Sequence, residues 1–299
     1  MRLLVTGASG LVGRHVVEAA VADVDITVIA SARSRPDTLA ASAEFVPADL
    51  GDAAAAARLV REVQPSHIIH TAWETRHPTY YEDIANLDWV GSAASMAGAF
   101  AQVGGKRFVQ VGSCAEYDWS GEGVSAAHPA SDRPATRYGW AKIAAFAAVQ
   151  AAAHGAFEAA EGRIFWIFGP GENPDRLIPL ICRSRLAGEV PKLGSGRQLR
   201  DLVYAPDAAM ALLALARADG LNGVVDIGSG QGVALSSVAE ALARIAGASE
   251  SGLGRRPDRP ADPPQLIAAA ERIRSTGWLP ATPMREALAT TYQWWSDQS

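Results

Sequence analysis

The sequence has little of several residue types, and each shortage excludes a class of protein. Only two cysteines occur in 299 residues, Cys114 and Cys182, and they have no metal-ligand spacing. We therefore expect a reducing compartment, no disulfide framework and no bound metal. Lysine is also scarce, at three residues. With a formal net charge of −5 and no basic run, the chain is not expected to bind nucleic acid.

Long apolar runs are also missing, although the chain is rich enough in apolar residues to fold. No stretch reaches the roughly 18 apolar residues that a membrane-spanning helix needs. The composition, 48% hydrophobic and 20% charged, predicts a globular protein with a sizeable core. Met1–Val5 runs straight into an apolar strand without the layout of a signal peptide, so we expect a cytoplasmic protein with no membrane partner.

Strand and helix patterns alternate through the first half of the chain. This alternation predicts an α/β fold, with a doubly wound parallel sheet covered by helices on both faces. After residue 168 prolines interrupt the pattern, which indicates one domain over 1–168 and a smaller C-terminal lobe over 169–299 that can return strands or helices to the main sheet. The expected strands are 2–6, 26–30, 44–47, 67–71, 107–112, 162–168 and 199–204, and the expected helices are 11–22, 52–63, 80–103, 137–153 and 206–218.

A glycine-rich turn follows the first expected strand. Gly7 permits the tight turn, Gly10 lets the backbone approach a pyrophosphate, and Gly13 lets the following helix pack against the strand. Free N–H groups and the positive end of the helix dipole then face the phosphates. This arrangement predicts a dinucleotide-binding (Rossmann) domain. The residues expected around the dinucleotide here are Gly7, Ser9, Gly10, Leu11, Val12 and Gly13.

The end of the second strand decides between the two nicotinamide cofactors. An acid at this position binds the ribose 2′-hydroxyl of NAD. Here the stretch Ser31-Ala32-Arg33-Ser34-Arg35 has no acid and two arginines, and a guanidinium pairs well with a 2′-phosphate. We therefore predict NADP(H), with NAD as the alternative if the arginines are only solvated loop charges. Ser31 and Arg33 are the expected cofactor contacts.

Two further strand ends point to the same cofactor site. Asp49 and Leu50 follow the third strand, and Thr71 and Ala72 follow the fourth. Because the carboxyl ends of parallel strands meet at one edge of the sheet, we expect these residues to line the adenine and ribose.

A tyrosine and a lysine four residues apart open the helix after the fifth strand. Tyr138 and Lys142 share a helix face, so the ammonium can lower the pKa of the phenol and hold the nicotinamide ribose. Ser113, at the end of the fifth strand, supplies a hydroxyl that binds the reacting oxygen. These three residues form the predicted catalytic set.

Together these motifs resemble one large family. TGASGLVG at residues 6–13, Ser113 four residues before Tyr117, and YGWAK at 138–142 are similar to the extended short-chain dehydrogenase/reductase superfamily. The nucleotide-sugar epimerase/dehydratase/reductase branch fits best. The resemblance continues in RIFWIFGPG at 163–171, LRDLVYAPD at 199–207 and TGWLP at 276–280, so it covers nearly the whole chain.

The resemblance implies hydride transfer between NAD(P) and a carbon of a nucleotide-linked sugar bound by the smaller lobe. It makes Tyr138 the acid/base, places Asn86 and Val111 at the cofactor, and implies a homodimer through the helices at 80–103 and 137–153. Trp166 departs from the family pattern, where asparagine is common, and this leaves the substrate open. The residues expected at the substrate are Trp73, Ser113, Cys114, Arg200 and Arg259.

The residues after Ser113 limit which reactions of this family the chain can catalyse. Family dehydratases carry an Asp-Glu pair there, whereas this chain has Cys114 and Ala115, which provide no carboxylate. Cys114 is also one place earlier than the cysteine of GDP-fucose-type enzymes, and on a strand that shift turns the side chain away from the substrate. Reduction and 4-epimerisation remain, and the arginines after the second strand favour an exchangeable NADPH, so we predict reduction of a 4-keto-6-deoxy sugar nucleotide. The alternatives are an NAD-retaining nucleotide-sugar 4-epimerase and a non-catalytic NADP-binding sensor or scaffold.

A second glycine-rich stretch, VVDIGSGQGVAL at 224–235, allows a competing interpretation. It resembles the first motif of S-adenosylmethionine methyltransferases, but too few residues follow it to complete their sheet. The reductase family has its own strand of this type at the same place, so we predict no second cofactor.

Overall fold

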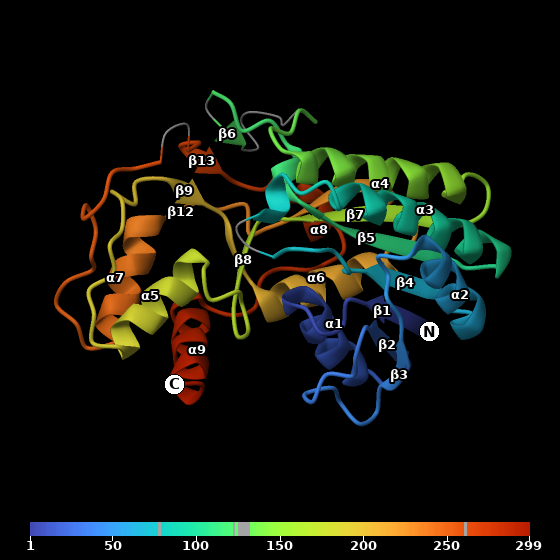
Figure 1. The fold of residues 1–299 in the computed structure, drawn as a ribbon, viewed down its shortest axis with the longest axis horizontal. Helices are drawn as coiled ribbons and strands as arrows, with labels where there is room; N and C mark the ends of the chain where they lie inside the picture. The colour runs from blue at the N-terminus through green and yellow to red at the C-terminus, as the bar shows by residue number, and fades with distance from the viewer. Residues whose placement is uncertain (77–78, 122, 125–131, 260–261) are drawn as a thin grey trace.

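The computed structural model describes residues 1–76, 79–121, 123–124, 132–259 and 262–299. Its centre is a seven-stranded parallel sheet with the strand order β11-β7-β5-β4-β1-β2-β3 (Figure 1). The chain leaves β1 toward β2 and β3 on one side and continues to β4, β5, β7 and β11 on the other, which confirms the predicted doubly wound fold. The strands are β1 Arg2–Thr6, β2 Thr27–Ala32, β3 Glu44–Pro47, β4 His67–His70, β5 Arg107–Ser113, β7 Glu158–Ile164 and β11 Gly223–Ile227.

Helices cover both faces of this sheet. Leu3 and Val5 of β1 pack into one apolar core together with residues of α1 and α6, whereas Leu4 packs into a second core with α2, α3 and α4. This division follows from the alternation of side chains along a strand. The helices are α1 Leu11–Val21 and α6 Ala205–Arg217 on one face, and α2 Ala53–Val63, α3 Asn86–Gln102 and α4 Arg137–Ala153 on the other.

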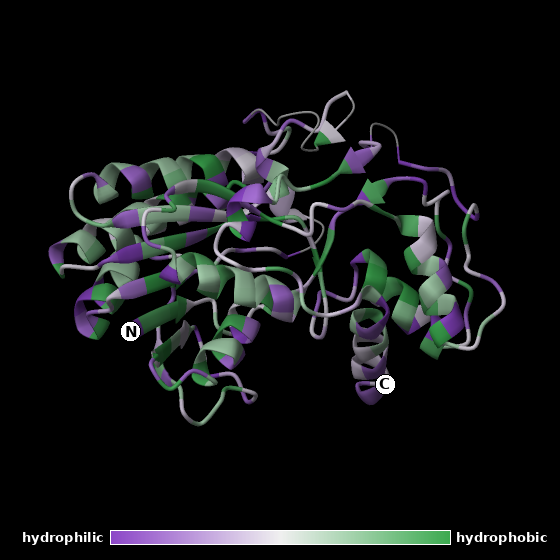
Figure 2. Cartoon of the chain, turned by 180° about the vertical axis from the view of Figure 1, so that it is seen from behind, coloured by the Kyte–Doolittle hydropathy of each residue, from purple (hydrophilic) through white to green (hydrophobic). Residues whose placement is uncertain are grey.

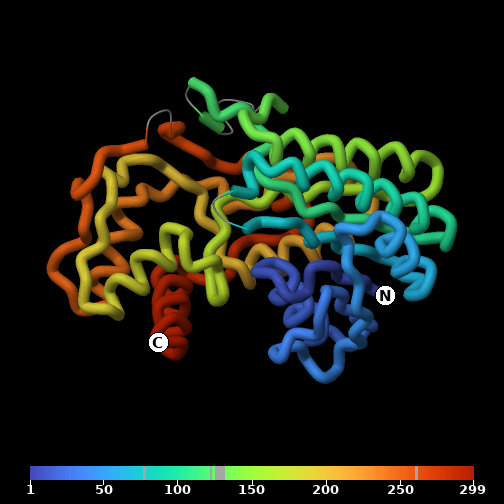
Figure 3. Tube along the Cα trace, in the orientation of Figure 1, coloured from blue at the N-terminus to red at the C-terminus, as the bar shows by residue number. Residues whose placement is uncertain are grey.

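The smaller lobe has its own apolar core, in which Phe168, Ile181, Leu242 and Leu288 are buried between three helices. The N-terminus lies in the larger lobe and the C-terminus in the smaller one (Figure 3). After residue 168 the chain does not stay in the smaller lobe, since α6 packs on the main sheet and β11 joins it. The division of the chain into two domains at residue 168 stays a prediction. The remaining elements are helices α5 Leu177–Leu186, α7 Leu235–Ile245, α8 Glu271–Arg274 and α9 Met284–Asp297, short turns η1 Thr79–Tyr81 and η2 Cys114–Glu116, the paired strands β8 Trp166–Phe168 and β10 Leu202–Tyr204, and a small sheet of β12 Val233–Ala234, β9 Leu199–Arg200, β13 Gln265–Leu266 and β6 Gly123–Val124.

The expected strand at 162–168 differs from the structure. β7 begins four residues earlier, at Glu158, and ends at Ile164, and β8 then joins a different sheet. The early part of β7 lacks the apolar run of a buried strand because it contains Glu158, which is partly exposed and pairs with Arg107, and Glu161, which is buried and pairs with Arg163. Figure 2 shows such hydrophilic residues within strands of the central sheet.

The expected helix at 80–103 is also shorter than predicted, since α3 begins at Asn86. Tyr80 and Tyr81 instead form the separate turn η1, where both rings pack edge-on against Tyr138. Among the described residues, no helix combines the length and apolar character needed to cross a membrane.

Candidate active site

A cavity of about 1060 Å³ opens at the carboxyl edge of the main sheet, where residues of the smaller lobe close its other side. It lies at the point where the chain direction reverses between β1 and β4, which is the usual ligand site of doubly wound sheets. Gly13, Ser31, Asn86 and Arg200 are not among its lining residues. The predicted site residues that do line it are Gly7, Ser9, Gly10, Leu11, Val12, Arg33, Asp49, Leu50, Thr71, Ala72, Trp73, Val111, Ser113, Cys114, Tyr138, Lys142 and Arg259.

The glycine-rich turn is shaped for a phosphate group. Gly7 has φ +67°, and a Cβ on it would lie 2.7 Å from the backbone nitrogen of Ala72. A Cβ on Gly13 would overlap the Gly7 carbonyl, so this glycine permits the close packing of α1 on the turn. α1 begins after Gly10 without a side-chain cap, which leaves the N–H groups of its first turn available to an anion. These features fit the pyrophosphate of a dinucleotide.

Two predicted cofactor residues lie just behind the cavity wall and hold its residues in place. The Ser31 carbonyl accepts a hydrogen bond from the Ala8 N–H at 3.1 Å, which fixes the glycine turn against β2. Asn86 Oδ1 accepts from Trp73 Nε1 at 2.8 Å, and Asn86 Nδ2 donates to the Tyr80 carbonyl at 2.6 Å. Asn86 therefore orients the Trp73 indole that faces the cavity.

The structure brings the predicted catalytic residues together at one end of the cavity. Thr136 caps α4 by accepting from the Gly139 N–H at 3.2 Å, and this places Tyr138 in the first turn of the helix. Lys142 Nζ donates to the Val111 carbonyl at 2.8 Å, and burial lowers its pKa to about 8. Ser113 is near enough to Tyr138 to lower the pKa of its hydroxyl.

The protonation of Tyr138 differs from the sequence prediction. The Tyr–Lys spacing predicted a lowered phenol pKa, but burial, followed by the nearby charge of Glu116, raises the pKa of Tyr138 above its usual range. Its contact with Ser113 acts in the opposite direction and is weaker. Tyr138 is therefore a neutral phenol that can donate a proton to an acceptor in the cavity.

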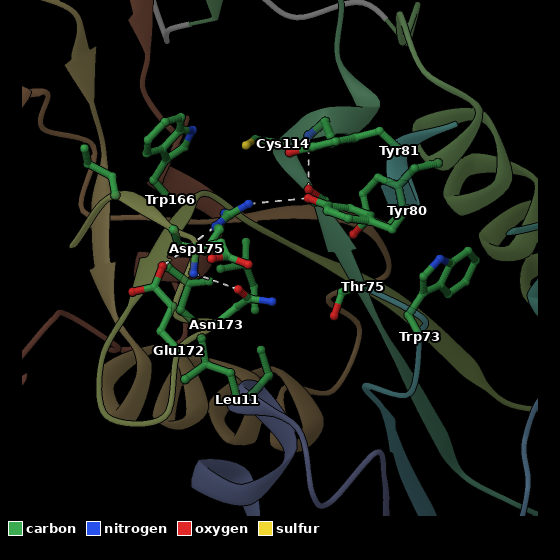
Figure 4. A pocket seen from close by; sticks show the side chains of 18 of the residues that line it. Leu11, Trp73, Thr75, Tyr80, Tyr81, Cys114, Trp166, Glu172, Asn173 and Asp175 are labelled. Atoms are coloured by element: carbon green, nitrogen blue, oxygen red, sulfur yellow. Dashed lines mark hydrogen bonds and ion pairs between the residues drawn. The ribbon is translucent and has the colours of Figure 1, made fainter. Parts of the chain in front are cut away.

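Cys114 lines the cavity, as expected of a residue at the substrate and contrary to the argument from strand alternation. β5 ends at Ser113, and Cys114 opens the turn η2, so the alternation of a strand no longer applies. A capping box sets this turn, because Ser113 Oγ accepts from the Ala115 N–H and Glu116 Oε1 accepts from the Ser113 N–H. Figure 4 shows the sulfur on the side of the cavity where Trp166 lies. Burial raises the pKa of the thiol to about 12, so it is neutral.

Arg200 does not take the position expected of a substrate ligand. Its side chain is fully buried, donates to the Pro263 carbonyl at 3.0 Å, and pairs with Asp262 at 2.6 Å. The guanidinium also stacks on Trp166, 4.9 Å from the ring centre, which gives this departure from the family pattern a packing role. Contact between Arg200 and a substrate would require breaking these interactions, whereas Arg259 is exposed and lines the cavity.

Sequence reasoning missed a polar cluster on the smaller-lobe side of the cavity (Figure 4). Glu172 Oε1 lies 3.8 Å from Arg176 Nε, and Arg176 donates to the Tyr80 hydroxyl at 3.4 Å. Burial raises the pKa of Glu172 to about 8, so its carboxyl holds a proton at neutral pH. Both residues follow the motif at 163–171 within five positions, and this was the signal available in the sequence. Arg256 also lines the cavity and was missed.

The second glycine-rich stretch is occupied by the protein itself. Asp201 Oδ1 accepts from the Ser229 N–H and Asp201 Oδ2 accepts from the Gly230 N–H, each at 2.8 Å. The N–H groups of the loop after β11 therefore bind the Asp201 carboxylate.

The fold and the site define a class of dinucleotide-binding enzymes with a serine, tyrosine and lysine at the end of the cavity. Residues 3–228 match the model of the NAD dependent epimerase/dehydratase family, and the chain belongs to this family. The prediction of the extended short-chain dehydrogenase/reductase superfamily, nucleotide-sugar branch, is confirmed.

Individual relatives agree with this assignment. The chain is 28% identical to UDP-glucose 4-epimerase of Azospirillum brasilense over 93% of its own length and 87% of that protein. It is 32% identical to GDP-L-fucose synthase 1 of Arabidopsis thaliana, over 53% of this chain and 52% of that one. The solved UDP-glucose 4-epimerase of Thermus thermophilus in complex with NAD has the same fold, with a TM-score of 0.85, 22% identity and full coverage of both chains. MoeE5 in complex with UDP-glucuronic acid and NAD has a TM-score of 0.81 and 27% identity, also with full coverage of both chains.

Proposed function

We propose that this enzyme uses NADP(H) to reduce the 4-keto group of a nucleotide-linked 6-deoxy sugar. The observation that carries this proposal is the position of Arg33. This arginine follows β2 and lines the cavity, at the point where NAD-specific relatives of this fold carry an acid. A guanidinium there favours a 2′-phosphate, and hence a cofactor that exchanges with solution after each reduction.

The residues at the end of the cavity can support this reaction. Gly7, Gly10 and the first turn of α1 would hold the cofactor pyrophosphate, and the bound cofactor would supply two electrons to C4. Ser113 would donate a hydrogen bond to the keto oxygen. The raised pKa keeps Tyr138 protonated, and Tyr138 would donate this proton to the same oxygen as the charge develops there.

The neighbours of Ser113 argue against dehydration. Elimination of water from the sugar needs an acid and a base beside the serine, where this chain has a neutral Cys114 thiol and Ala115. The second candidate is a nucleotide-sugar 4-epimerase that retains NAD. It is favoured by the UDP-glucose 4-epimerase of A. brasilense, which aligns with nearly the whole chain, and it requires only the serine, tyrosine and lysine.

Cofactor binding and turnover test these alternatives together. NADPH and NADH affinities are measured by calorimetry, and ultraviolet absorbance detects any nucleotide that copurifies. NADPH oxidation is then followed with UDP-, GDP- and dTDP-linked 4-keto-6-deoxyhexoses, with Tyr138→Phe as the control that binds cofactor without turnover. Preferential NADPH binding with oxidation supports the reductase. Retained NAD with conversion of UDP-glucose to UDP-galactose supports the epimerase, and NADPH binding without any turnover supports a sensor or scaffold.

We also propose that the enzyme is a homodimer formed through α3 and α4. Ala93, Ala97 and Ala145 on these helices are buried in the protomer's own core, so they are not available to a partner. Leu87 and Trp140 are exposed, by 52% and 55%, and provide apolar surface for a second copy. Light scattering after size exclusion tests this, and Trp140→Glu should yield a monomer.

A further inference from the structure

Three charged side chains lie behind Ser113, on the side away from the cavity. Glu116 and Glu161 have no exposed surface, and Arg163 is 2% exposed. Gly112 leaves the space for them, because a Cβ there would lie 2.8 Å from both Glu116 Oε1 and Glu161 Cγ. Two carboxyl groups therefore meet one guanidinium in a closed site.

Two carboxylate oxygens of this site accept no hydrogen bond from the described residues. Arg163 Nε carries one hydrogen, donates it to Glu161 Oε2 at 2.8 Å, and lies 2.9 Å from Glu116 Oε2. In the described part of the chain, Glu116 Oε2 and Glu161 Oε1 are left without a hydrogen-bond donor. A buried acceptor without a donor destabilises the folded state. Both carboxyl groups lie against the same nitrogen, Arg163 Nε, and one proton between them would satisfy one of these oxygens.

The charges around the site lead to the same conclusion. Arg163 also pairs with Asp132 at 2.7 Å, so ionisation of both glutamates would place three anions around one cation. Two carboxylates that share a buried site cannot both ionise readily, and one of them keeps a proton. Of the two glutamates, Glu116 is the one whose ionised form is stabilised more, because its Oε1 also accepts a hydrogen bond from the Ser113 N–H at 2.6 Å. Burial raises the pKa of both carboxyl groups, and it raises the pKa of Glu161 more than that of Glu116.

Gln110 is cross-strand from Glu161, and its buried amide makes no hydrogen bond in the described part of the chain. Other titratable groups also face the pair. Lys142 and Tyr138 approach from α4, and the Lys142 ammonium favours a single anion at Glu116. The Tyr117 ring lies under the Arg163 guanidinium, with 4.6 Å between the ring centre and Arg163 Cζ. The Tyr117 hydroxyl donates a hydrogen bond to Asp226 of β11 at 2.6 Å.

We propose that Glu116 and Glu161 share one proton, with Glu161 as its carrier, and that this acid–carboxylate pair positions Ser113 through the Ser113 backbone N–H. The pair then holds one negative charge behind Tyr138 and Lys142. The positioning role rests on the proposed function, whereas the shared proton does not depend on it.

Infrared difference spectroscopy of the full-length protein tests the shared proton. Subtracting the Glu161→Gln spectrum from that of the wild type at pH 7 should show the loss of a carboxylic-acid C=O band. Glu116→Gln should lose the same band, because its amide can donate to Glu161 and leave Glu161 ionised. Glu172→Gln is the control for the other buried acid, and the band of the pair should survive it. Loss of carboxylate bands alone in Glu161→Gln would overturn the proposal.

Unfolding by urea supplies a second test that does not depend on activity. Each single Gln variant keeps one buried negative charge beside Arg163 and should remain folded. The double variant Glu116→Gln/Glu161→Gln leaves Arg163 only the half-exposed Asp132, so its destabilisation should exceed the sum of the two single effects. If the double variant fails to fold while both single variants fold, this also counts as a destabilisation greater than the sum of the single effects. Additive effects of the two substitutions would overturn the proposal that the pair carries one shared negative charge.

Turnover in the proposed reductase assay tests the positioning role. Glu116→Gln keeps an acceptor for the Ser113 N–H, so kcat should stay within about three-fold of the wild type. Glu116→Leu removes the acceptor and should lower kcat by about ten-fold or more, with NADPH affinity unchanged, since one buried hydrogen bond is at stake. Equal kcat in both variants would overturn the positioning role. A wild type with no turnover on any keto sugar would instead refute the proposed function and this role with it, while the infrared result would still decide the shared proton.

Discussion

The Lys142 ammonium lies 3.9 Å from the centre of the Trp73 indole ring, close enough for a cation–π interaction. Such contacts are worth about 2 kcal/mol when they are removed from water. Trp73→Leu should therefore lower kcat/KM by about ten-fold or more, because Lys142 loses its orientation. Trp73→Phe keeps a ring and should have a smaller effect. Steady-state kinetics of NADPH oxidation measure both variants, and equal losses would show that the Trp73 hydrogen bond to Asn86 matters more than the ring.

The lowered pKa of Lys142 predicts a pH dependence of stability. Burial brings this pKa from 10.5 in the unfolded chain to about 8 in the folded protein. Between these values the unfolded state binds more protons, so the contribution of Lys142 to the free energy of unfolding rises with pH from about 8 to 10.5. Below about pH 8 both states are protonated and this slope vanishes.

Replacing the lysine isolates this effect. Lys142→Met should remove the rise, so the difference in unfolding free energy between wild type and variant should change with pH only above about pH 8. Urea unfolding at intervals from pH 7 to 10 measures it. A constant difference across this range would mean that Lys142 titrates normally.

Arg33 and Arg35 form a matched pair for testing cofactor choice. Arg33 lines the cavity, whereas the Arg35 guanidinium lies over the Phe45 ring, 5.8 Å from its centre. Arg33→Ala should weaken NADPH binding by about 10- to 100-fold and leave NADH binding nearly unchanged, because a charge-assisted hydrogen bond contributes roughly 1.5–3 kcal/mol. Arg35→Ala should affect neither. Calorimetry with both cofactors checks this, and equal effects on NADPH and NADH would refute a 2′-phosphate contact.

The parts of the site that could be predicted depend on short distances along the chain. The turn from Gly7 to Gly13 and the spacing of Tyr138 and Lys142 are set within one helix and the loop before it. The strand-end residues Asp49 and Thr71 reach the cavity because parallel strands place their carboxyl ends at one edge. Local pattern and fold class together were enough for these positions.

The remaining positions depend on partners far away in the sequence. Arg200 is buried because Asp262 and the Pro263 carbonyl meet it, and nothing near Arg200 in the chain indicates this. Cys114 faces the cavity because the backbone turns at Ser113, which strand alternation cannot predict. The start of β7 was missed because the partner of Glu158 is Arg107, on a neighbouring strand.

The two arginines predicted at the substrate should respond differently to mutation. Arg200→Met removes one partner of a buried ion pair and should destabilise the fold by about 3 kcal/mol or more. Arg259→Met removes an exposed cavity residue and should leave the free energy of unfolding within about 0.5 kcal/mol while raising KM for the nucleotide sugar. Urea unfolding and steady-state kinetics on both variants separate these effects. An unchanged stability of Arg200→Met would restore the substrate role predicted from the sequence.

Two glycines in helices should respond to alanine in opposite ways. A Cβ on Gly13 of α1 would overlap the Gly7 carbonyl, whereas a Cβ on Gly98 of α3 has no atom within 4 Å. Gly13→Ala should therefore push α1 away from the turn, destabilise the fold and weaken binding of both NADPH and NADH. Gly98→Ala should stabilise the helix by about 0.5–1 kcal/mol without changing cofactor affinity. Urea unfolding and calorimetry on the two variants test this, and normal cofactor binding by Gly13→Ala would show that the turn is not the pyrophosphate site.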